Sequence, residues 1–142
     1  MSAIVLKTAE EIALIEQSAQ LVSKTLGMLA KEVVPGAMPL ELDRLAETFI
    51  RDHGGEPGFL GMYDFPNTLN WSPNEQVVHG IPDHTPLKDG DIISIDCGVY
   101  MNGYYGDHAY TFEVGEVHPD KKKLLKIAKE SLYVVIAQFN AS

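Results

Sequence analysis

Residues 92–114 read IISIDCGVYMNGYYGDHAYTFEV, and this stretch decides the fold. Its first nine residues form an apolar run of the length and composition of a buried strand. The pair Asn102-Gly103 follows, and Asn-Gly between two such runs is the strongest short indication of a hairpin. A return strand would run from about Tyr104 to Val114. We therefore predict an antiparallel hairpin with a two-residue turn.

Two aspartates lie on one face of this predicted hairpin. Asp96 stands in the middle of the first strand, where a buried carboxylate without a partner would be costly. A two-residue turn places Asp96 opposite Ala109, and Asp107 lies two residues away on the same face. Such diagonal neighbours are about 7–8 Å apart at Cα, so their side chains can converge. The hairpin therefore directs two carboxylates into one space.

Paired carboxylates favour a metal site but do not complete one. Two negative groups repel each other unless a positive group lies between them, and such pairs can bridge two divalent ions. The spacing is equally compatible with one aspartate that caps a turn and another that is solvated. Two ligands are also too few to close a protein metal site. From spacing alone, both interpretations stay open.

A capping box predicts where the first helix begins. Thr8-Ala9-Glu10-Glu11 has the required spacing, with Thr8 as the N-cap and Glu11 reaching back. Apolar residues then recur at intervals of three and four, as on one face of a long helix. They are Ile12, Ile15, Ala19, Val22, Leu26, Leu29 and Val33. The pair Pro35-Gly36 would end this helix.

Two further helices and a set of short strands complete the predicted layout. The second helix would end at Gly54-Gly55, and its buried side is Leu42, Leu45, Ala46, Phe49 and Ile50. Short apolar pieces alternate with Gly, Pro and Asn over residues 56–82, which indicates short strands and loops. His118-Pro119 opens a third helix, with an apolar face of Leu124, Leu125, Ala128, Leu132, Val135, Ile136 and Phe139. This order predicts an α+β or mixed α/β layer with a mostly antiparallel sheet.

Composition limits the classes of partner. The chain has 142 residues, enough for one compact domain, and 20 acidic against 11 basic residues give a formal charge of −9. This charge argues against nucleic acid or an anionic membrane surface as a partner, and it suits a site for divalent cations or a substrate amine. The lone Cys97 is best explained as a small buried hydrophobe. Neither a signal peptide nor a membrane span is recognisable, so we expect a cytoplasmic protein.

Five histidines are candidates for chemistry: His53, His79, His84, His108 and His118. His79 lies in VVHGIP (residues 77–82), which we interpret as an apolar strand entering a Gly/Pro turn. It could position a substrate, donate a proton or bind a metal, and the alternative is a core histidine with a backbone hydrogen bond. His108 follows Asp107 and so points to the opposite face, which suggests a structural or exposed residue. His118 is expected to cap the third helix, and we assign no role to the other two.

Four segments in order closely resemble the core of bacterial type I methionine aminopeptidases. They are residues 74–82 (NEQVVHGIP), 87–92 (LKDGDI), 94–98 (SIDCG) and 103–107 (GYYGD). Each motif alone is modest, but four in this order and spacing are specific. The similarity runs from Ile4 to about Leu132, so residues 1–142 are expected to be the N-terminal half of that family's catalytic domain, with the C-terminal half absent.

The resemblance implies a fold and a set of site residues. The fold is the pita-bread (creatinase/aminopeptidase) fold, an α/β sandwich of two similar halves with helices covering a mostly antiparallel sheet. Asp96 and Asp107 match metal ligands, and Asp107 is expected to bridge both ions. His79 matches a histidine that contacts the substrate and assists the developing tetrahedral intermediate. The implied methionine pocket is lined by Phe59, Met62, Phe65 and Asn70.

The implied activity is removal of the initiator methionine from nascent proteins by two-metal-assisted peptide hydrolysis. The implied cofactors are two divalent ions (Co, Mn, Fe or Zn) and a monovalent cation near the carbonyls of Asn74 and Gln76. The implied partner is the N-terminal methionine of nascent peptides at the ribosome.

Departures from the family leave three readings. Members run to roughly twice this length, and a histidine and two glutamates that complete the metal ligands lie in the part not present. Asn70 stands where bacterial members usually have cysteine, and Trp71 and Pro73 are also unusual. The chain is then the first half of an enzyme that is active when intact, or a half-fold module that binds peptide or metal without catalysis. The third reading, a prolidase-like relative, is disfavoured because those proteins typically carry an arginine near Tyr110. A half-sheet would also leave apolar surface uncovered, so self-association or a second half is expected.

Overall fold

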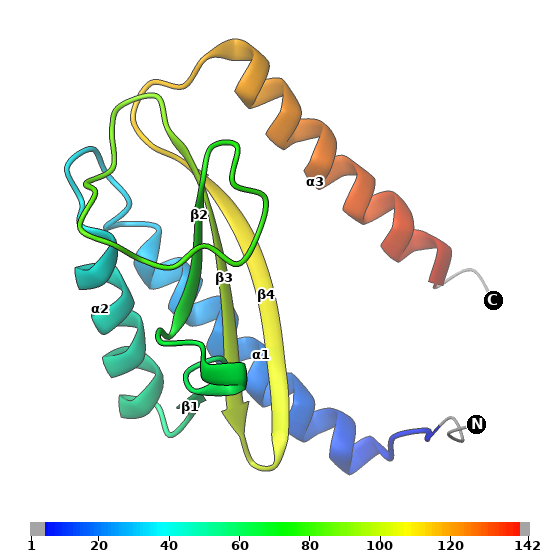
Figure 1. Ribbon diagram of the computed structural model, residues 1–142. Coiled ribbons are helices and arrows are strands. Elements are labelled where there is room, and N and C mark those ends of the chain that lie inside the picture. The colour runs from blue at the N-terminus through cyan, green and yellow to red at the C-terminus, as the bar shows by residue number, and fades with distance from the viewer. Residues whose placement is uncertain (1–4, 140–142) are drawn as a thin grey trace.

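The computed structural model describes residues 5–139, which leaves both ends of the predicted 1–142 domain, residues 1–4 and 140–142, outside the description (Figure 1). In chain order the elements are α1 (Ala9–Leu29), α2 (Pro39–Asp52), β1 (Glu56–Pro57), the 3-10 turn η1 (Met62–Asp64), β2 (Leu69–Pro73), β3 (Ile92–Met101), β4 (Tyr104–Glu113) and α3 (Pro119–Phe139). β4 pairs with one edge of β3, while β1 and β2 pair with the other, all antiparallel. The predicted order of two helices, strands and a helix is confirmed.

The predicted hairpin register is also confirmed. Asp96 is the partner of Ala109, so Asp107 lies on the same face two residues along. Both turn residues have positive φ, 56° at Asn102 and 86° at Gly103. This is the conformation that a two-residue type I′ turn requires, and Asn-Gly adopts it at little cost. Local turn chemistry therefore sets the position of both carboxylates.

α1 and α2 pack on one face of the sheet (Figure 1), and strand alternation puts Asp96 on the other face. Alternate residues of β3 face these helices and are fully buried: Ile93, Ile95, Cys97 and Val99. The predicted role of Cys97 as a buried hydrophobe is confirmed, and burial raises the pKa of its thiol to about 12. The core therefore supports the strand from behind and leaves its other face for chemistry.

α1 begins at the predicted capping box. Glu11 N donates to Thr8 Oγ1 at 3.2 Å, and Thr8 N donates to Glu11 Oε2 at 2.8 Å. The helix ends at Leu29, however, so the predicted end at Pro35 is wrong. Turns follow instead, in which Glu32 N and Val33 N both donate to Leu29 O, and Gly36 N then donates to Leu87 O at 2.7 Å in the loop before β3.

The buried face of α1 is rotated from the predicted apolar stripe. It consists of Ser18, Leu21, Val22, Thr25, Leu26 and Leu29, whereas Ile12 is 55% exposed. The Ser18 hydroxyl lies 3.1 and 3.0 Å from the carbonyl oxygens of Met101 and Tyr104 at the end of the hairpin. Gly106 allows this close approach, because a Cβ there would collide with the α1 backbone. Hydrogen bonding to a distant carbonyl makes a serine a core residue, which apolar periodicity cannot reveal.

α2 buries a carboxylate that the sequence did not single out. Asp43 accepts hydrogen bonds from Thr68 N (3.0 Å) and Leu69 N (2.8 Å), and from the side chain of Asn67 (3.0 Å). Leu45, predicted on the buried side, is 39% exposed instead. Asp43 thus ties α2 to the start of β2, the strand beside Asp96.

α3 begins at the predicted Pro119 and extends away from the sheet, as Figure 1 shows. None of its residues is buried, so its predicted apolar face is uncovered within residues 5–139. A groove of about 750 Å³ separates it from β4. In the same part of the chain, no helix is long and apolar enough to cross a membrane. An isolated amphipathic helix gains little stability without a packing partner.

We expect the isolated chain to self-associate through α3, because exposed apolar side chains on it include Leu132 and Val135. Sedimentation velocity should show species larger than a monomer, and Leu132→Glu should shift the distribution toward the monomer. Gln138→Glu adds the same charge to the same helix and should leave the distribution unchanged. A single monomer boundary for the unmodified chain would contradict this expectation.

Candidate metal and substrate site

Asp96 and Asp107 reach one face of the hairpin from neighbouring strands. Asp96 pairs with Ala109, while Asp107 pairs with Gly98, so the two carboxylates are diagonal neighbours. Asp107 is exposed and Asp96 is half-buried. The Oδ1 atom of Asp96 is buried and has no hydrogen-bond partner. A buried carboxylate oxygen without a hydrogen-bond partner is rare in proteins. A functional role, such as binding an ion, is one explanation for such an atom.

Neighbouring groups change the pKa of Asp96. Burial raises the pKa of Asp96 above its ordinary value, and the negative charge of the nearby Asp107 carboxylate raises it further. Asn70 and His79 act in the opposite direction on the same pKa. The strand register thus brings three of the predicted site residues, Asn70, Asp96 and Asp107, to one face of the sheet, and His79 acts on Asp96 through its charge. An added cation would relieve the repulsion that the two carboxylates exert on each other.

The residues present fit part of a divalent metal site. Carboxylate oxygens are suitable ligands, and Oδ1 of Asp96 has no hydrogen-bond partner. Within residues 5–139, however, no group of three or more His, Cys, Asp and Glu side chains is placed to hold a metal ion. This part of the chain could thus offer two carboxylates to a metal ion, and any further ligands would come from elsewhere.

His79 lies in a loop, so the strand predicted for residues 77–79 is wrong. Val77 is 81% exposed and Val78 59% exposed, and His79 itself has a positive φ of 58°. Gly80 holds the loop against β2: its oxygen accepts from Trp71 N at 2.8 Å, and its N–H donates to Ser72 Oγ at 3.1 Å. The two valines point outward because the loop is fixed by backbone hydrogen bonds rather than by apolar burial.

Ser72 is a site-supporting residue that sequence reasoning missed. It is buried and lies on the same face of β2 as Asn70, two positions away. Its hydroxyl anchors the residue that follows His79. Alternate residues of a strand share one face, so the sequence could have placed Ser72 on the same face as Asn70. Only the long-range contact to Gly80 reveals the role of Ser72.

The predicted methionine-pocket residues are only partly gathered. The Phe59 ring packs on Gly98, the strand partner of Asp107, and a Cβ at Gly98 would overlap that ring. Asn70 lies opposite Asp96. Met62, in η1, is 40% exposed, and Phe65 follows η1. Phe59 and Asn70 therefore border the aspartate pair.

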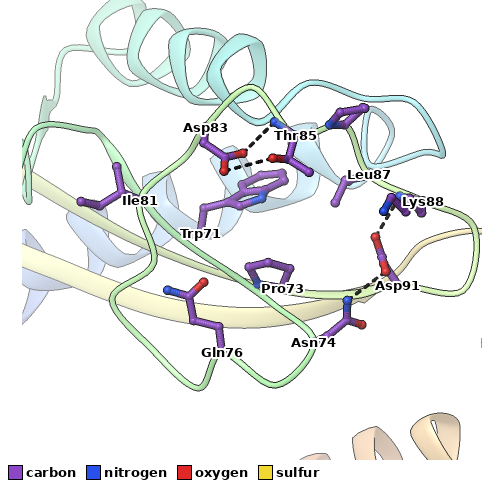
Figure 2. Close-up of a pocket in the computed structure, with 11 residues that line it drawn as sticks. Trp71, Pro73, Asn74, Gln76, Ile81, Asp83, Thr85, Leu87, Lys88 and Asp91 are labelled. Carbon is purple, nitrogen blue, oxygen red and sulfur yellow. Dashed lines mark hydrogen bonds between the residues drawn. The ribbon is translucent and has the colours of Figure 1, made fainter.

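A cavity of about 220 Å³ lies beside Trp71 and is shown in Figure 2. Its lining includes Asn74 and Gln76, the residues whose carbonyls were expected near a monovalent cation. The Asn74 side chain donates to Asp91 at 2.9 Å, and its oxygen accepts from Ile92 N at 3.2 Å. These contacts make Asn74 a structural link between the loop and β3.

The first turn of α3 is hydrogen-bonded to Asn74. Lys121 Nζ donates to Asn74 Oδ1 at 2.9 Å and to Gly90 O at 2.8 Å. His118 Nδ1 accepts from Asp120 N at 3.2 Å, which confirms its predicted capping role. His108 is exposed, as expected. Hydrogen bonds therefore fix the start of α3, although no residue of the helix is buried within residues 5–139.

Sequence comparison places this chain beside methionine aminopeptidases. Residues 13–141 match the profile of metallopeptidase family M24. A methionine aminopeptidase of Clostridium perfringens is 47% identical over 130 residues, which are 92% of this chain and 52% of that protein. Methionine aminopeptidase 1 of Bacillus subtilis is 45% identical, with the same shares covered.

Structural comparison agrees. The methionine aminopeptidase of Rickettsia prowazekii superposes with a TM-score of 0.90 at 31% identity, over 92% of this chain and 53% of that one. Prolidase from Pyrococcus furiosus has a TM-score of 0.75 at 21% identity, over 89% of this chain and 36% of that one, which shows a shared fold alone. The chain spans about half the length of the curated relatives that it matches.

Proposed function

This chain belongs to metallopeptidase family M24, and from that premise we propose that it forms the N-terminal half of a methionine aminopeptidase catalytic domain. Its α/β architecture with an antiparallel sheet is the pita-bread class of the M24 structures it matches. The proposed reaction is hydrolysis of the peptide bond after an N-terminal methionine. A second half would supply the remaining ligands.

The observation that carries this proposal is the Asp96–Asp107 pair. The two carboxylates share one face of the hairpin, and Asp96 keeps a buried oxygen free of any protein donor. A structural carboxylate in that position would normally be hydrogen-bonded, as Asp43 is in the same chain. The free oxygen instead suits coordination of a divalent ion.

The roles of individual residues follow from their positions. Asp96 and Asp107 would hold divalent ions, and such ions polarise a scissile carbonyl. His79, on the exposed loop beside Asp96, would donate a hydrogen bond to the substrate carbonyl oxygen as negative charge develops. Phe59, packed on Gly98 next to Asp107, would offer an apolar surface to the methionine side chain.

Finer details belong to the same proposal. The divalent ions would be Co, Mn, Fe or Zn, and a monovalent cation would lie at the carbonyls of Asn74 and Gln76. Substrates would be nascent proteins carrying their initiator methionine, met at the ribosome in the cytoplasm. Met62 and Phe65 would join the pocket when the second half covers η1.

A second candidate function is a module that binds metal or peptide without catalysis. It is favoured by one observation, the absence of a third ligand near the pair within residues 5–139. This candidate predicts binding of divalent ions without peptide hydrolysis under any condition.

The test is hydrolysis of a Met-Ala-Ser peptide by the chain, with Co²⁺ or Mn²⁺, alone and mixed with the second half of the Clostridium perfringens relative. We expect activity in the mixture and none with either half alone, and a Leu-Ala-Ser peptide should be cleaved far more slowly. No hydrolysis in a mixture that forms a stable complex would contradict the proposal and favour the binding module. Activity of this chain alone would show that the remaining ligands come from this chain itself, for example from a second copy in a dimer.

A further inference from the structure

Asn70 lies directly against the Asp96 carboxylate. The two residues are Cα partners on the neighbouring strands β2 and β3, so their side chains share one face of the sheet. Asn70 Nδ2 donates to Asp96 Oδ2 at 3.5 Å. The Asn70 side chain is only 8% exposed. A buried amide beside a metal-ligand carboxylate is therefore part of this site.

The two oxygens of Asp96 have different surroundings. Asn70 approaches from β2 and engages Oδ2, whereas Asp107 approaches from β4 on the opposite side of β3. Oδ1 is buried and has no partner. The torsion that rotates a carboxylate is soft, so a single donor can select one orientation. Asn70 holds one oxygen and leaves the other free.

We propose that Asn70 is a positioning residue that orients the Asp96 carboxylate so that Oδ1 faces a divalent ion held together with Asp107. The proposal rests on the metal-binding function proposed above. A residue without a strong donor at this position, such as cysteine, could not fix the carboxylate in this way. This orientation of the Asp96 carboxylate therefore depends on the asparagine at position 70.

The size of the effect follows from the geometry. Removing a group that hydrogen-bonds a metal ligand typically weakens metal affinity by about 10- to 100-fold. The 3.5 Å separation is at the long limit for a hydrogen bond. We therefore expect a loss at the lower end of that range, about tenfold.

The experiment measures Mn²⁺ affinity of the full chain by electron paramagnetic resonance of the free ion. Asn70→Ala should weaken binding about tenfold. Asn70→Leu removes the donor but keeps the side-chain volume, so it serves as the test if Asn70→Ala folds poorly. We expect it to weaken Mn²⁺ binding by the same factor. Asn67→Ala is the matched control, because it removes another amide that donates to a carboxylate, at 3.0 Å to Asp43. That variant should destabilise the chain and leave Mn²⁺ affinity unchanged.

Asp107→Ala separates failure of this inference from failure of the proposed function. If Asp107→Ala loses Mn²⁺ binding while both Asn70 variants bind as the unmodified chain does, the positioning role is wrong and the metal pair stands. If Asp107→Ala leaves binding unchanged, the metal pair itself is wrong and the role of Asn70 falls with it. An equal loss in Asn67→Ala and Asn70→Ala would also overturn the proposal, because it would show a general effect of destabilisation.

Discussion

Asp107→Ala is expected to reduce hydrolysis of Met-Ala-Ser by at least about a thousandfold in the mixture of this chain with a second half. Metal ions contribute several kcal/mol of transition-state stabilisation, and about 4 kcal/mol corresponds to a thousandfold in rate. Asp107 is exposed and is placed beside Asp96 by the hairpin register, so its removal should not unfold the chain. The measurement is the rate of methionine release at saturating Mn²⁺.

Glu113→Ala provides the control for this experiment. Glu113 lies on the same strand and the same face as Asp107, where it pairs with Ile92, and its carboxylate is 3.9 Å from the Lys122 ammonium. Its loss removes an equal charge at a distance from Asp96 and should leave the rate within about threefold, as for a surface substitution. Equal losses in both variants would indicate a general charge effect and contradict the assigned role of Asp107.

Asp43→Ala is expected to be the most damaging of these substitutions for stability, with a loss of about 3 kcal/mol in the free energy of unfolding. The reason is that the N–H groups of Thr68 and Leu69 would lose their acceptor, and both residues are fully buried. Each unsatisfied buried donor costs about 1–3 kcal/mol. Urea unfolding followed by circular dichroism gives the measurement. Glu41→Ala, at an exposed acid on the same helix, should change stability by less than about 0.5 kcal/mol.

Because Asp43 is buried, we also expect the free energy of unfolding to depend on pH. Burial raises the pKa of Asp43 above its ordinary value of 3.8, although hydrogen bonds from Asn67, Leu69 and Thr68 oppose the rise. Because the folded pKa is higher than the unfolded one, Asp43 contributes stability below pH 3.8 that is lost as pH rises through the folded pKa. Asp43→Asn does not titrate there. The unfolding free energy of the parent minus that of Asp43→Asn should therefore fall as pH rises above 3.8, and a difference that grows would show that the shift has the opposite sign.

The features that the sequence predicts correctly are those with local causes. Asn102-Gly103 specifies its own turn, and the turn alone places Asp96 opposite Ala109. Thr8 and Glu11 satisfy each other's backbone donors within one helical turn, so the start of α1 is equally local.

Features that depend on distant contacts were predicted poorly. The path of the chain after α1 includes a bond from Gly36 to the distant Leu87, and the burial of Ser18 depends on two carbonyls of the hairpin. Asp43 drew no prediction, because its hydrogen-bond partners are residues 67–69, outside α2. In each case a tertiary hydrogen bond overrides the pattern that apolar spacing indicates.

In the candidate site, too, features with local causes were predicted and features that depend on distant contacts were not. The convergence of Asp96 and Asp107 follows from strand alternation, which a sequence displays directly. The loop conformation of His79 depends on Gly80 pairing with Trp71, and two adjacent valines gave it the pattern of a strand. The contact between Asn70 and Asp96 required the register of β2, a short strand with no distinctive turn to align it.

Asp96 and Asp107 are proposed to form the chain's divalent-metal site, and the ¹H–¹⁵N spectrum of the chain titrated with substoichiometric Mn²⁺ tests this proposal. A bound paramagnetic ion broadens the nearest amides first. We predict early broadening at residues 95–97 and 106–108, which Asp96→Asn together with Asp107→Asn should abolish. Early broadening centred instead on other acidic positions, such as Asp89, Asp91 and Glu116, would show that the net charge of −9 merely collects cations and would rule out the Asp96–Asp107 site.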